Sequence, residues 1–271
     1  MNYEVAEAVA PGWERRRAEI EEASAPVREW MLRALAPEAG QTVLELAAGV
    51  GDTGLEAAAA LGERGRLIST DCSPAMLEAA RRRGAELGAA NVDYRLIDAE
   101  RIELADDSVD GVSCRFGYML MARPAAALAE TRRVLRPGGR LALAVFGPPE
   151  RNPFCSAFAI SLVQGGHMPP PAPAGPGLFS MASRQRTTEL LESAGFGDIR
   201  TEDVVMTFEL PGIDECVAFI TDTTGPIAMV LRGLSAADRE AVKAQAEAAL
   251  ERFAAASGYR IPGVALCAVA A

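Results

Sequence analysis

The stretch VLELAAGVGDTG, residues Val43 to Gly54, contains glycines at a spacing that decides the fold. They match the pattern G-x-G-x-x-G, which here follows a predicted strand (Thr42 to Leu46) and precedes an alanine-rich predicted helix (Leu55 to Leu61). Glycines at such a turn remove side chains, so that a ligand can approach the main chain and the positive end of the helix. We therefore expect a ligand-binding turn.

An acidic residue follows the next predicted strand. Asp71 stands after Arg66 to Thr70 and twenty positions beyond Gly51. A carboxylate at this place can accept hydrogen bonds from both hydroxyls of a ribose. The glycine turn and Asp71 together predict a ligand that contains a ribose.

From Thr42 to Phe146, short apolar runs alternate with helical stretches, which is typical of βαβ units around a parallel sheet. One helix is clearly marked, because Ser73 can cap it, Pro74 suits its first position and Gly88 can end it. The predicted fold class is α/β, a Rossmann-like doubly wound sheet with helical insertions. Its first five strands are expected at Thr42–Leu46, Arg66–Thr70, Val92–Ile97, Val109–Phe116 and Leu141–Phe146.

The segments on either side of this region differ from it. Residues 14–36 are predicted to form one or two helices, with Trp13 at their start, because apolar residues recur at helical spacing. Residues 168–177 contain five prolines and are predicted to form an extended surface connection. Beyond them we expect a helix over 187–196, a strand over 199–210, helices within 213–257 and a final strand over 263–270.

These segments fit one domain. We expect a single domain over residues 1–271, with an N-terminal helical segment over 1–38 and substrate-side insertions over 151–182 and 211–257. The oligomeric state is not indicated by the sequence.

The composition excludes several kinds of partner. The 271 residues carry a formal net charge of −10, which disfavours binding to nucleic acids and to anionic membranes. One histidine and five cysteines without a C-x-x-C pair indicate neither a metal site nor a disulfide framework. The apolar runs fall short of the roughly 18 residues of a membrane span, and the first residues lack a signal-peptide pattern, so we expect a cytoplasmic protein.

Nicotinamide dinucleotides and S-adenosylmethionine both fit the turn, because each presents an adenosine to the same topology. Glu45 favours the second, since a carboxylate inside the first strand suits an ammonium group and repels a pyrophosphate. Lys243 is the only lysine and has Arg239 four residues before it, so no Tyr-x-x-x-Lys pair supports hydride transfer. An NAD-dependent oxidoreductase is the alternative function, and a non-catalytic adenosyl-binding protein is a third.

Four segments resemble the successive motifs of class I S-adenosylmethionine-dependent methyltransferases, in particular the branch of the ubiquinone and menaquinone C-methyltransferases. They are ELAAGVG from Glu45, DCSPAMLEAA from Asp71, IDAERIELADDSVDGVSCRF from Ile97 and LRPGGRL from Leu135. The resemblance covers residues 40–146 and implies a seven-stranded sheet of order 3-2-1-4-5-7-6 with the last strand antiparallel. It departs at Ala47, where the family's first motif usually has glycine.

The resemblance implies that the matching residues bind S-adenosyl-L-methionine. Glu45 and the backbone of the turn would hold the methionyl end, and Asp71 would hold the ribose hydroxyls. The implied cofactor residues are Glu45, Ala47, Gly49 and Gly51 in the turn, Asp71, Cys72 and Met76 along the ribose and adenine, Asp98, Ala99 and Glu100 at the polar edge of the adenine, and Arg115 and Phe116 beside the methionyl part.

The acceptor is expected at the carboxyl ends of the strands, where open α/β sheets bind ligands. Methyl transfer needs orientation and exclusion of water, and no acid or base is obligatory. If a base is needed, His167 and Tyr118 are the candidates. The predicted acceptor residues favour a small, partly apolar molecule methylated on oxygen or carbon, and they are Trp13, Tyr118, Met119, Arg151, Asn152 and Phe154.

Overall fold

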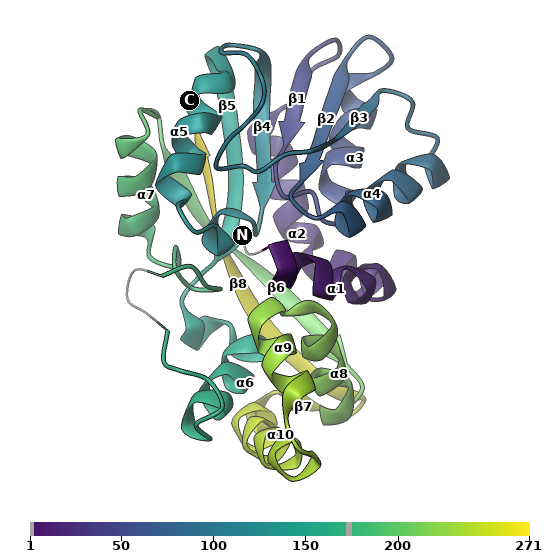
Figure 1. The fold of residues 1–271 in the computed structure, drawn as a ribbon, viewed down its shortest axis with the longest axis vertical. Coiled ribbons are helices and arrows are strands. Elements are labelled where there is room, and N and C mark those ends of the chain that lie inside the picture. The colour runs from purple at the N-terminus through teal and green to yellow at the C-terminus, as the bar shows by residue number, and fades with distance from the viewer. Residues whose placement is uncertain (1–2, 172–174) are drawn as a thin grey trace.

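The computed structural model describes residues 3–171 and 175–271, which form one mixed sheet covered by helices (Figure 1). The strands run in the order β3-β2-β1-β4-β5-β8-β6. The strand β8 is antiparallel to both of its neighbours, β5 and β6, and the pairs from β3 to β5 are parallel. The predicted order is confirmed, with β8 as the predicted seventh strand. The structure adds a short β7, which pairs with β8.

The strands of the described chain are β1 (Thr42–Glu45), β2 (Arg66–Asp71), β3 (Val92–Leu96), β4 (Val109–Arg115), β5 (Leu135–Phe146), β6 (Arg200–Leu210), β7 (Ala254–Ala255) and β8 (Gly258–Ala270). Its α-helices are α1 (Tyr3–Arg15), α2 (Arg17–Leu35), α3 (Asp52–Leu61), α4 (Pro74–Glu86), α5 (Pro124–Val134), α6 (Pro153–Gln164), α7 (Arg184–Ser193), α8 (Ile213–Thr223), α9 (Gly225–Gly233) and α10 (Ala236–Leu250). As predicted, Ser73 caps α4, and its hydroxyl accepts a hydrogen bond of 3.1 Å from the Met76 N–H.

Alternating side chains of the central strands divide the core between the two faces of the sheet. Val43 of β1 belongs to the cluster that α2 and α3 complete, whereas Leu44 belongs to the cluster of α5 and α7. Leu67 and Ile68 of β2 divide in the same way. Because successive residues of a strand point to opposite faces, this alternation fixes the side on which Glu45 lies, the side of α2 and α3.

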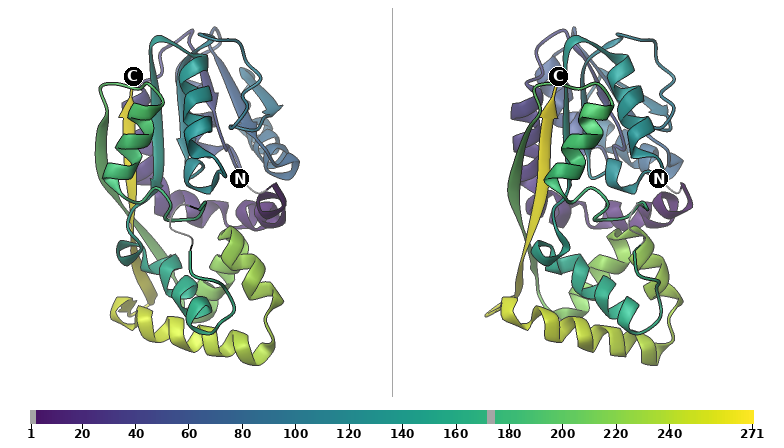
Figure 2. Two further views of the ribbon diagram at one scale, coloured as in Figure 1. Left: turned by 60° about the vertical axis from the view of Figure 1, so that its left-hand side comes forward. Right: turned by 90° about the vertical axis from the view of Figure 1, so that its left-hand side faces the viewer.

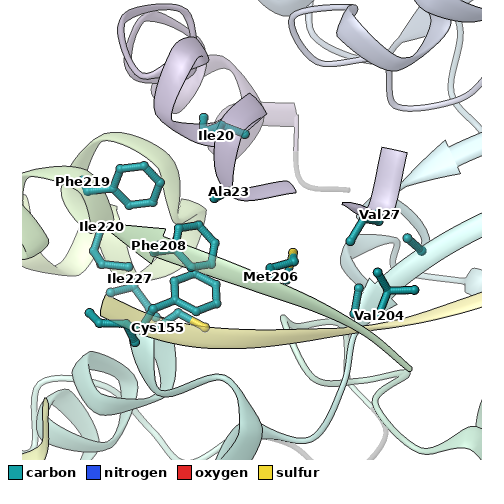
Figure 3. Close-up of a cluster of buried hydrophobic side chains, with 14 of the residues drawn as sticks. Ile20, Ala23, Val27, Cys155, Val204, Met206, Phe208, Phe219, Ile220 and Ile227 are labelled. Atoms are coloured by element: carbon teal, nitrogen blue, oxygen red, sulfur yellow. The ribbon is translucent and has the colours of Figure 1, made fainter. Parts of the chain in front are cut away.

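The strands β6 and β8 are longer than β1 to β4 and extend past the carboxyl ends of those strands (Figure 2). The helices α6, α8, α9 and α10 gather around this extension, and α1 crosses between them and the sheet (Figures 1 and 2). Figure 3 shows Phe208 of β6 beside Phe219 of α8, with Ile20 of α2 nearby. An apolar group of helices therefore lies next to the carboxyl ends of the central strands, where ligands are expected.

Several predicted boundaries differ from the structure. The N-terminal helices begin at Tyr3 rather than at residue 14, and Trp13 lies inside α1. The small buried residues Ala6 and Ala10 pack this helix, and alanine gives only a weak periodic signal. The strand β5 begins at Leu135 rather than at Leu141, because Leu135 pairs with Val109 before the register shifts at the Pro-Gly-Gly segment.

The structure of the insertions agrees in part with what the sequence predicts. Residues 213–257 are mainly helical, as expected, and end in β7. In the proline-rich stretch, residues 168–171 and 175–177 form neither helix nor strand, and residues 172–174 lie outside the described residues. No helix in the described ranges is long and apolar enough to cross a bilayer.

Candidate active site

The turn after β1 folds as the glycine pattern predicts. Gly49 and Gly51 have φ angles of +57° and +90°, in the left-handed region that glycine enters without steric cost. A Cβ on Gly51 would lie 2.9 Å from the Ala80 Cβ of α4, whereas a Cβ on Gly49 would meet nothing within 4 Å. Gly51 therefore lets the turn pack on α4, and Gly49 leaves the main chain open to a cavity.

Two residues other than glycine also have left-handed backbone beside this cavity. Ala47 and Phe116 have φ angles of +51° and +59°, and both line the cavity. A side chain on the neighbouring Gly117 would place its Cβ 2.7 Å from the Ala47 Cβ. The methyl group of Ala47, which departs from the family pattern, is accommodated because Gly117 has none. Strained backbone of this kind concentrates at functional sites.

Glu45 is a buried carboxylate beneath the turn. It accepts hydrogen bonds of 2.6 Å from the Gly54 N–H and 2.9 Å from the Ser69 hydroxyl. Burial raises the pKa of Glu45 to about 8, although these bonds and the charge of Arg115 oppose the shift. A group held in this way favours a cationic neighbour, because a cation would stabilise its charged form.

Asp71 holds the other side of the turn. One of its oxygens accepts a hydrogen bond from the Gly49 N–H and the other accepts one from the Ser73 N–H, both at 2.9 Å. Burial raises the pKa of Asp71, and these backbone hydrogen bonds oppose the shift. Asp71 also lines the cavity.

The cavity has a volume of about 240 Å³ and a polar end. Glu45, Gly49, Asp71 and Arg115 line that end together with Thr53. The Thr53 hydroxyl is buried and has no hydrogen-bond partner among the residues that the structure describes. A buried polar group without a partner is costly unless a ligand or water satisfies it. The donor and acceptor set at this end therefore fits a polar, zwitterionic group attached to a ribose.

A row of aromatic rings leads away from the polar end. Phe116 stacks on Phe146 with ring centroids 4.6 Å apart, and Phe146 meets the edge of Phe154 at 5.4 Å. Phe154 stacks on Phe208 at 4.0 Å, and Phe208 meets Phe219 at 5.7 Å. All five side chains line the cavity. This end is apolar and shaped by flat rings, which suits an aromatic or otherwise planar molecule.

The helix α1 forms another wall. Val5, Val9 and Trp13 line the cavity, and the Trp13 indole N–H donates a hydrogen bond of 2.8 Å to the Thr223 carbonyl of α8. On the other side, the Ser73 hydroxyl donates to Glu7. The helix therefore bridges the sheet half and the insertion half of the cavity.

The structure brings many of the predicted residues to this cavity. Trp13, Met119 and Phe154 of the predicted acceptor set line it. From the predicted cofactor set, the lining contains Glu45, Ala47, Gly49, Asp71, Met76, Arg115 and Phe116.

Other predicted cofactor residues lie outside the lining. Gly51 packs on α4, and Cys72 and Ala99 do not line the cavity. The Asp98 carboxylate accepts from the Glu100 N–H at 2.9 Å, and the Glu100 carboxylate pairs with Arg123 at 2.9 Å. The expected contacts of Cys72, Asp98, Ala99 and Glu100 with an adenine stay predictions.

The two predicted bases are not at the cavity. The Tyr118 hydroxyl is fully buried and hydrogen-bonded to the Thr131 hydroxyl at 2.6 Å, and burial raises its pKa well above 10. Tyr118 is therefore a core residue, which corrects its assignment to the acceptor site. His167 lies after α6, with its Nε2 4.0 Å from an Asp238 oxygen, and it does not line the cavity.

Two more acceptor residues are corrected. Arg151 is exposed and forms an ion pair with Asp203. Asn152 is buried, where its amide donates to the Gly147 carbonyl at 3.1 Å and its oxygen accepts from the Val264 N–H at 2.9 Å. Asn152 ties the start of α6 to β8, so its amide is occupied by the backbone.

Some lining residues were missed. Val5, Ala6 and Val9 of α1, Ile20 and Ser24 of α2, and Thr223, Thr224, Gly225 and Pro226 at the junction of α8 and α9 all line the cavity. Met206 and Phe208 could have been found, because with Val204 they occupy one face of a predicted strand. The turn at 223–226 had no comparable signal.

Comparison with known proteins decides the family. The sequence profile described as the ubiE/COQ5 methyltransferase family matches residues 26–168. The chain belongs to this family. The match includes the whole polar end of the cavity, from Glu45 to Arg115, and it excludes the aromatic contributions of β6 and α8.

A demethylmenaquinone methyltransferase of Clavibacter sepedonicus is 40% identical over 117 residues, which are 43% of this chain and 46% of that protein. The chain spans about half the length of the curated relatives it matches. These relatives give no support to the NAD-dependent oxidoreductase.

Solved structures share the fold. A SAM dependent methyltransferase from Aquifex aeolicus has a TM-score of 0.54 at 22% identity, over 70% of this chain and 92% of that one. The cyclase SpnF has a TM-score of 0.58 at 17% identity, over 98% and 96%. The fold is thus the Rossmann-like fold of the methyltransferases. Because a cyclase shares it, the chemistry has to be argued from the site.

Proposed function

We propose that this chain is an S-adenosylmethionine-dependent methyltransferase that acts on a small aromatic molecule. The observation that carries the proposal is one cavity that joins an acidic, glycine-lined end to a row of five phenylalanine rings. The family match supports the cofactor, since it covers the acidic end.

The residues of the polar end fit the cofactor. Glu45 would accept hydrogen bonds from the ammonium of the methionyl end, and Asp71 would accept them from the ribose hydroxyls. Gly49 would allow close approach of the main chain, and Met76 would lie against the adenine. S-adenosylmethionine, when bound, supplies an electrophilic methyl group on a positively charged sulfur.

The chain contributes to the reaction by positioning the two reactants and by excluding water from the cavity. Phe116 and Phe146 lie where the polar end meets the aromatic end and would hold an acceptor ring beside the cofactor. Trp13 and Val9 of α1 line the same cavity and would help to exclude water from it. Holding two reactants in a productive orientation contributes as much as about 7–11 kcal/mol.

We propose that the acceptor resembles a quinol, methylated on ring carbon or oxygen. One relative is named a demethylmenaquinone methyltransferase, and a flat ring of that kind fits between phenylalanine side chains. The five rings carry no proton acceptor, so the acceptor would react as the anion of its own hydroxyl, and the one proton released for each methyl group transferred would pass to solvent.

Thermal unfolding with ligands tests the cofactor. S-adenosylhomocysteine at about 100 times its dissociation constant should stabilise the protein by about 2.7 kcal/mol, and NADH should not. Protection by NADH alone would reject the proposal. Incubation with S-adenosylmethionine and a panel of quinols, followed by mass spectrometry, then tests the reaction. Cofactor binding with no methylated quinol would reject the proposed acceptor class.

A further inference from the structure

Two threonines add hydroxyl groups to the wall that the insertion after β6 contributes to the cavity. Thr223 ends α8, Thr224 lies directly before α9, and both line the cavity. Their exposed fractions are 9% and 7%, so both are buried. The other lining residues of this insertion, which is described throughout, are Phe219, Gly225 and Pro226. Since none of these three has a polar side chain, a molecule at this wall meets hydroxyls at the two threonines.

The hydroxyl of Thr223 is occupied within its own helix. It donates a hydrogen bond of 2.7 Å to the Phe219 carbonyl, one turn earlier in α8. A hydroxyl has one proton, so this bond uses the donor of Thr223. The Thr223 carbonyl is also occupied, because it accepts a hydrogen bond of 2.8 Å from the Trp13 indole N–H. These bonds hold the junction of α8 and α9 against α1.

The hydroxyl of Thr224 is poorly satisfied. It does not cap α9, and among the described residues its hydrogen-bond contact is with the Thr223 hydroxyl, at 3.3 Å. This contact is weak, because O–H···O bonds are usually about 2.5–3.0 Å long. Thr223 has given its proton to Phe219, so Thr224 must be the donor in it, and the lone pairs of Thr224 stay unused. A ligand that donates a hydrogen bond to this buried oxygen would therefore be favoured.

The place of Thr224 in the chain favours a contact with the acceptor. Phe219, on the same face of α8 as Thr223, is the last ring of the aromatic row. The family match includes the polar end and stops at residue 168, before α8 and α9. The junction of α8 and α9 therefore belongs to the part of the chain that builds the aromatic end.

We propose that the Thr224 hydroxyl accepts a hydrogen bond from a second hydroxyl of the acceptor, other than the one that reacts as its anion. This inference rests on the proposed function, because it takes the aromatic acceptor from it. It assigns Thr224 as a specificity-determining residue, which favours aromatic diols over phenols with one hydroxyl. A quinol meets this requirement, since one of its two oxygens can ionise while the other stays protonated and donates to Thr224.

Steady-state kinetics with two acceptors test this assignment. They are 1,4-dihydroxynaphthalene and 1-naphthol, which differ by one hydroxyl and are assayed without oxygen. The measured quantity is the ratio of kcat/KM for the diol to kcat/KM for the phenol, and its change between proteins cancels the intrinsic reactivities. Thr224→Val keeps the shape of the side chain and should lower this ratio about 2- to 10-fold, the range of one neutral hydrogen bond. Thr224→Ser should keep the ratio near that of the wild-type protein.

Thr187→Val is the matched control. It also removes a buried hydroxyl, which donates a hydrogen bond of 2.8 Å to the Met181 carbonyl, but Thr187 does not line the cavity. The ratio should therefore stay unchanged. The Kd for S-adenosylhomocysteine should be the same in Thr224→Val as in the wild-type protein. Unfolding midpoints check that each variant folds, and Thr224→Ala replaces Thr224→Val if the latter does not.

Three results would overturn the assignment. In the first, Thr224→Val has the wild-type ratio, with or without a weaker Kd for S-adenosylhomocysteine. In the second, Thr224→Ser lowers the ratio as much as Thr224→Val does, so that side-chain shape rather than the hydroxyl decides. In the third, Thr187→Val lowers the ratio equally. A wild-type protein that binds S-adenosylhomocysteine but methylates neither compound would reject the proposed acceptor class, and this inference with it. Failure to bind S-adenosylhomocysteine would reject the proposed function itself.

Discussion

A carboxylate buried beneath a ligand site is poorly solvated until a cation reaches it, and Glu45 is in this position. Among the described residues its hydrogen bonds come from Gly54 and Ser69, both neutral donors, and the charge of Arg115 offsets only part of the cost of burial. Burial therefore leaves it largely protonated at neutral pH in the absence of ligand. Binding of a cationic ligand and loss of this proton should be coupled.

The first prediction concerns the stability of the ligand-free protein. The pKa of Glu45 rises from 4.5 to about 8 on folding, so the folded chain binds a proton that the unfolded chain has released. Between these two pH values the free energy of unfolding should fall as pH rises, by up to about 1.4 kcal/mol per unit from this group. Urea unfolding across this window should show that fall, and Glu45→Gln should reduce it. An equal slope in the variant would contradict the assigned pKa.

The second prediction concerns the contact between Glu45 and Gly54. A Cβ on Gly54 would lie 2.1 Å from a Glu45 carboxylate oxygen. Gly54→Ala should therefore destabilise the protein by about 1–3 kcal/mol, the usual cost of overpacking. In a Glu45→Ala background the same change should be neutral or stabilising, because the space is then free. Denaturant unfolding of the four proteins measures the coupling, and additive effects would show that the clash is relieved elsewhere.

At the scale of elements, the helix α1 joins two halves of the molecule that the sequence leaves separate. Arg82 of α4 binds Glu14 with hydrogen bonds of 2.9–3.0 Å, and Arg16, directly after α1, binds Asp222 of α8 at 2.9 Å. Since α1 also lines the cavity, these contacts at its C-terminal end hold one wall of the site against both α4 and α8.

The third prediction follows from the packing of α1 on α8. A Cβ on Gly12 would lie 2.1 Å from the Asp222 carbonyl oxygen, so Gly12→Ala should displace α1. We expect lower stability and faster release of S-adenosylhomocysteine. The release can be measured by stopped-flow fluorescence of Trp13. Gly233→Ala, at the end of α9, is the matched control, because its Cβ would meet nothing within 4 Å. Equal release rates in the two variants would argue against α1 as a wall that retains the ligand.

The sequence identified residues that line the polar end of the cavity and missed most of the aromatic end, for a physical reason. Glu45, Gly49 and Asp71 lie next to strand ends, where local chemistry and backbone freedom restrict the residue type, so a short pattern identifies them. Phe208 and Phe219 line the cavity only because β6 extends past the sheet and α8 packs on it. Tyr118 was misassigned because its neighbours Phe116 and Met119 do face the cavity.

At the scale of the whole molecule, the two ends of the cavity, which we propose bind the cofactor and the acceptor, are built by different parts of the fold. The polar end is built largely from residues at the carboxyl ends of β1, β2 and β4. Much of the aromatic end is built from α6, β6 and α8. The family match covers the first part and α6, and it stops before β6. We therefore expect that substitutions in β6 and α8 can change the acceptor without disturbing the cofactor site.

The last prediction separates the two ends. Phe208 stacks on Phe154 at 4.0 Å and is almost fully buried at the aromatic end. Phe208→Leu keeps the site apolar but removes a ring contact worth about 0.5–1.5 kcal/mol, so the KM for an aromatic acceptor should rise about 2- to 10-fold. The Kd for S-adenosylhomocysteine should not change. Phe253→Leu, a comparable loss outside the cavity lining, should leave both constants unchanged. If Phe208→Leu weakened cofactor binding and left the acceptor KM unchanged, the acceptor would have to bind elsewhere.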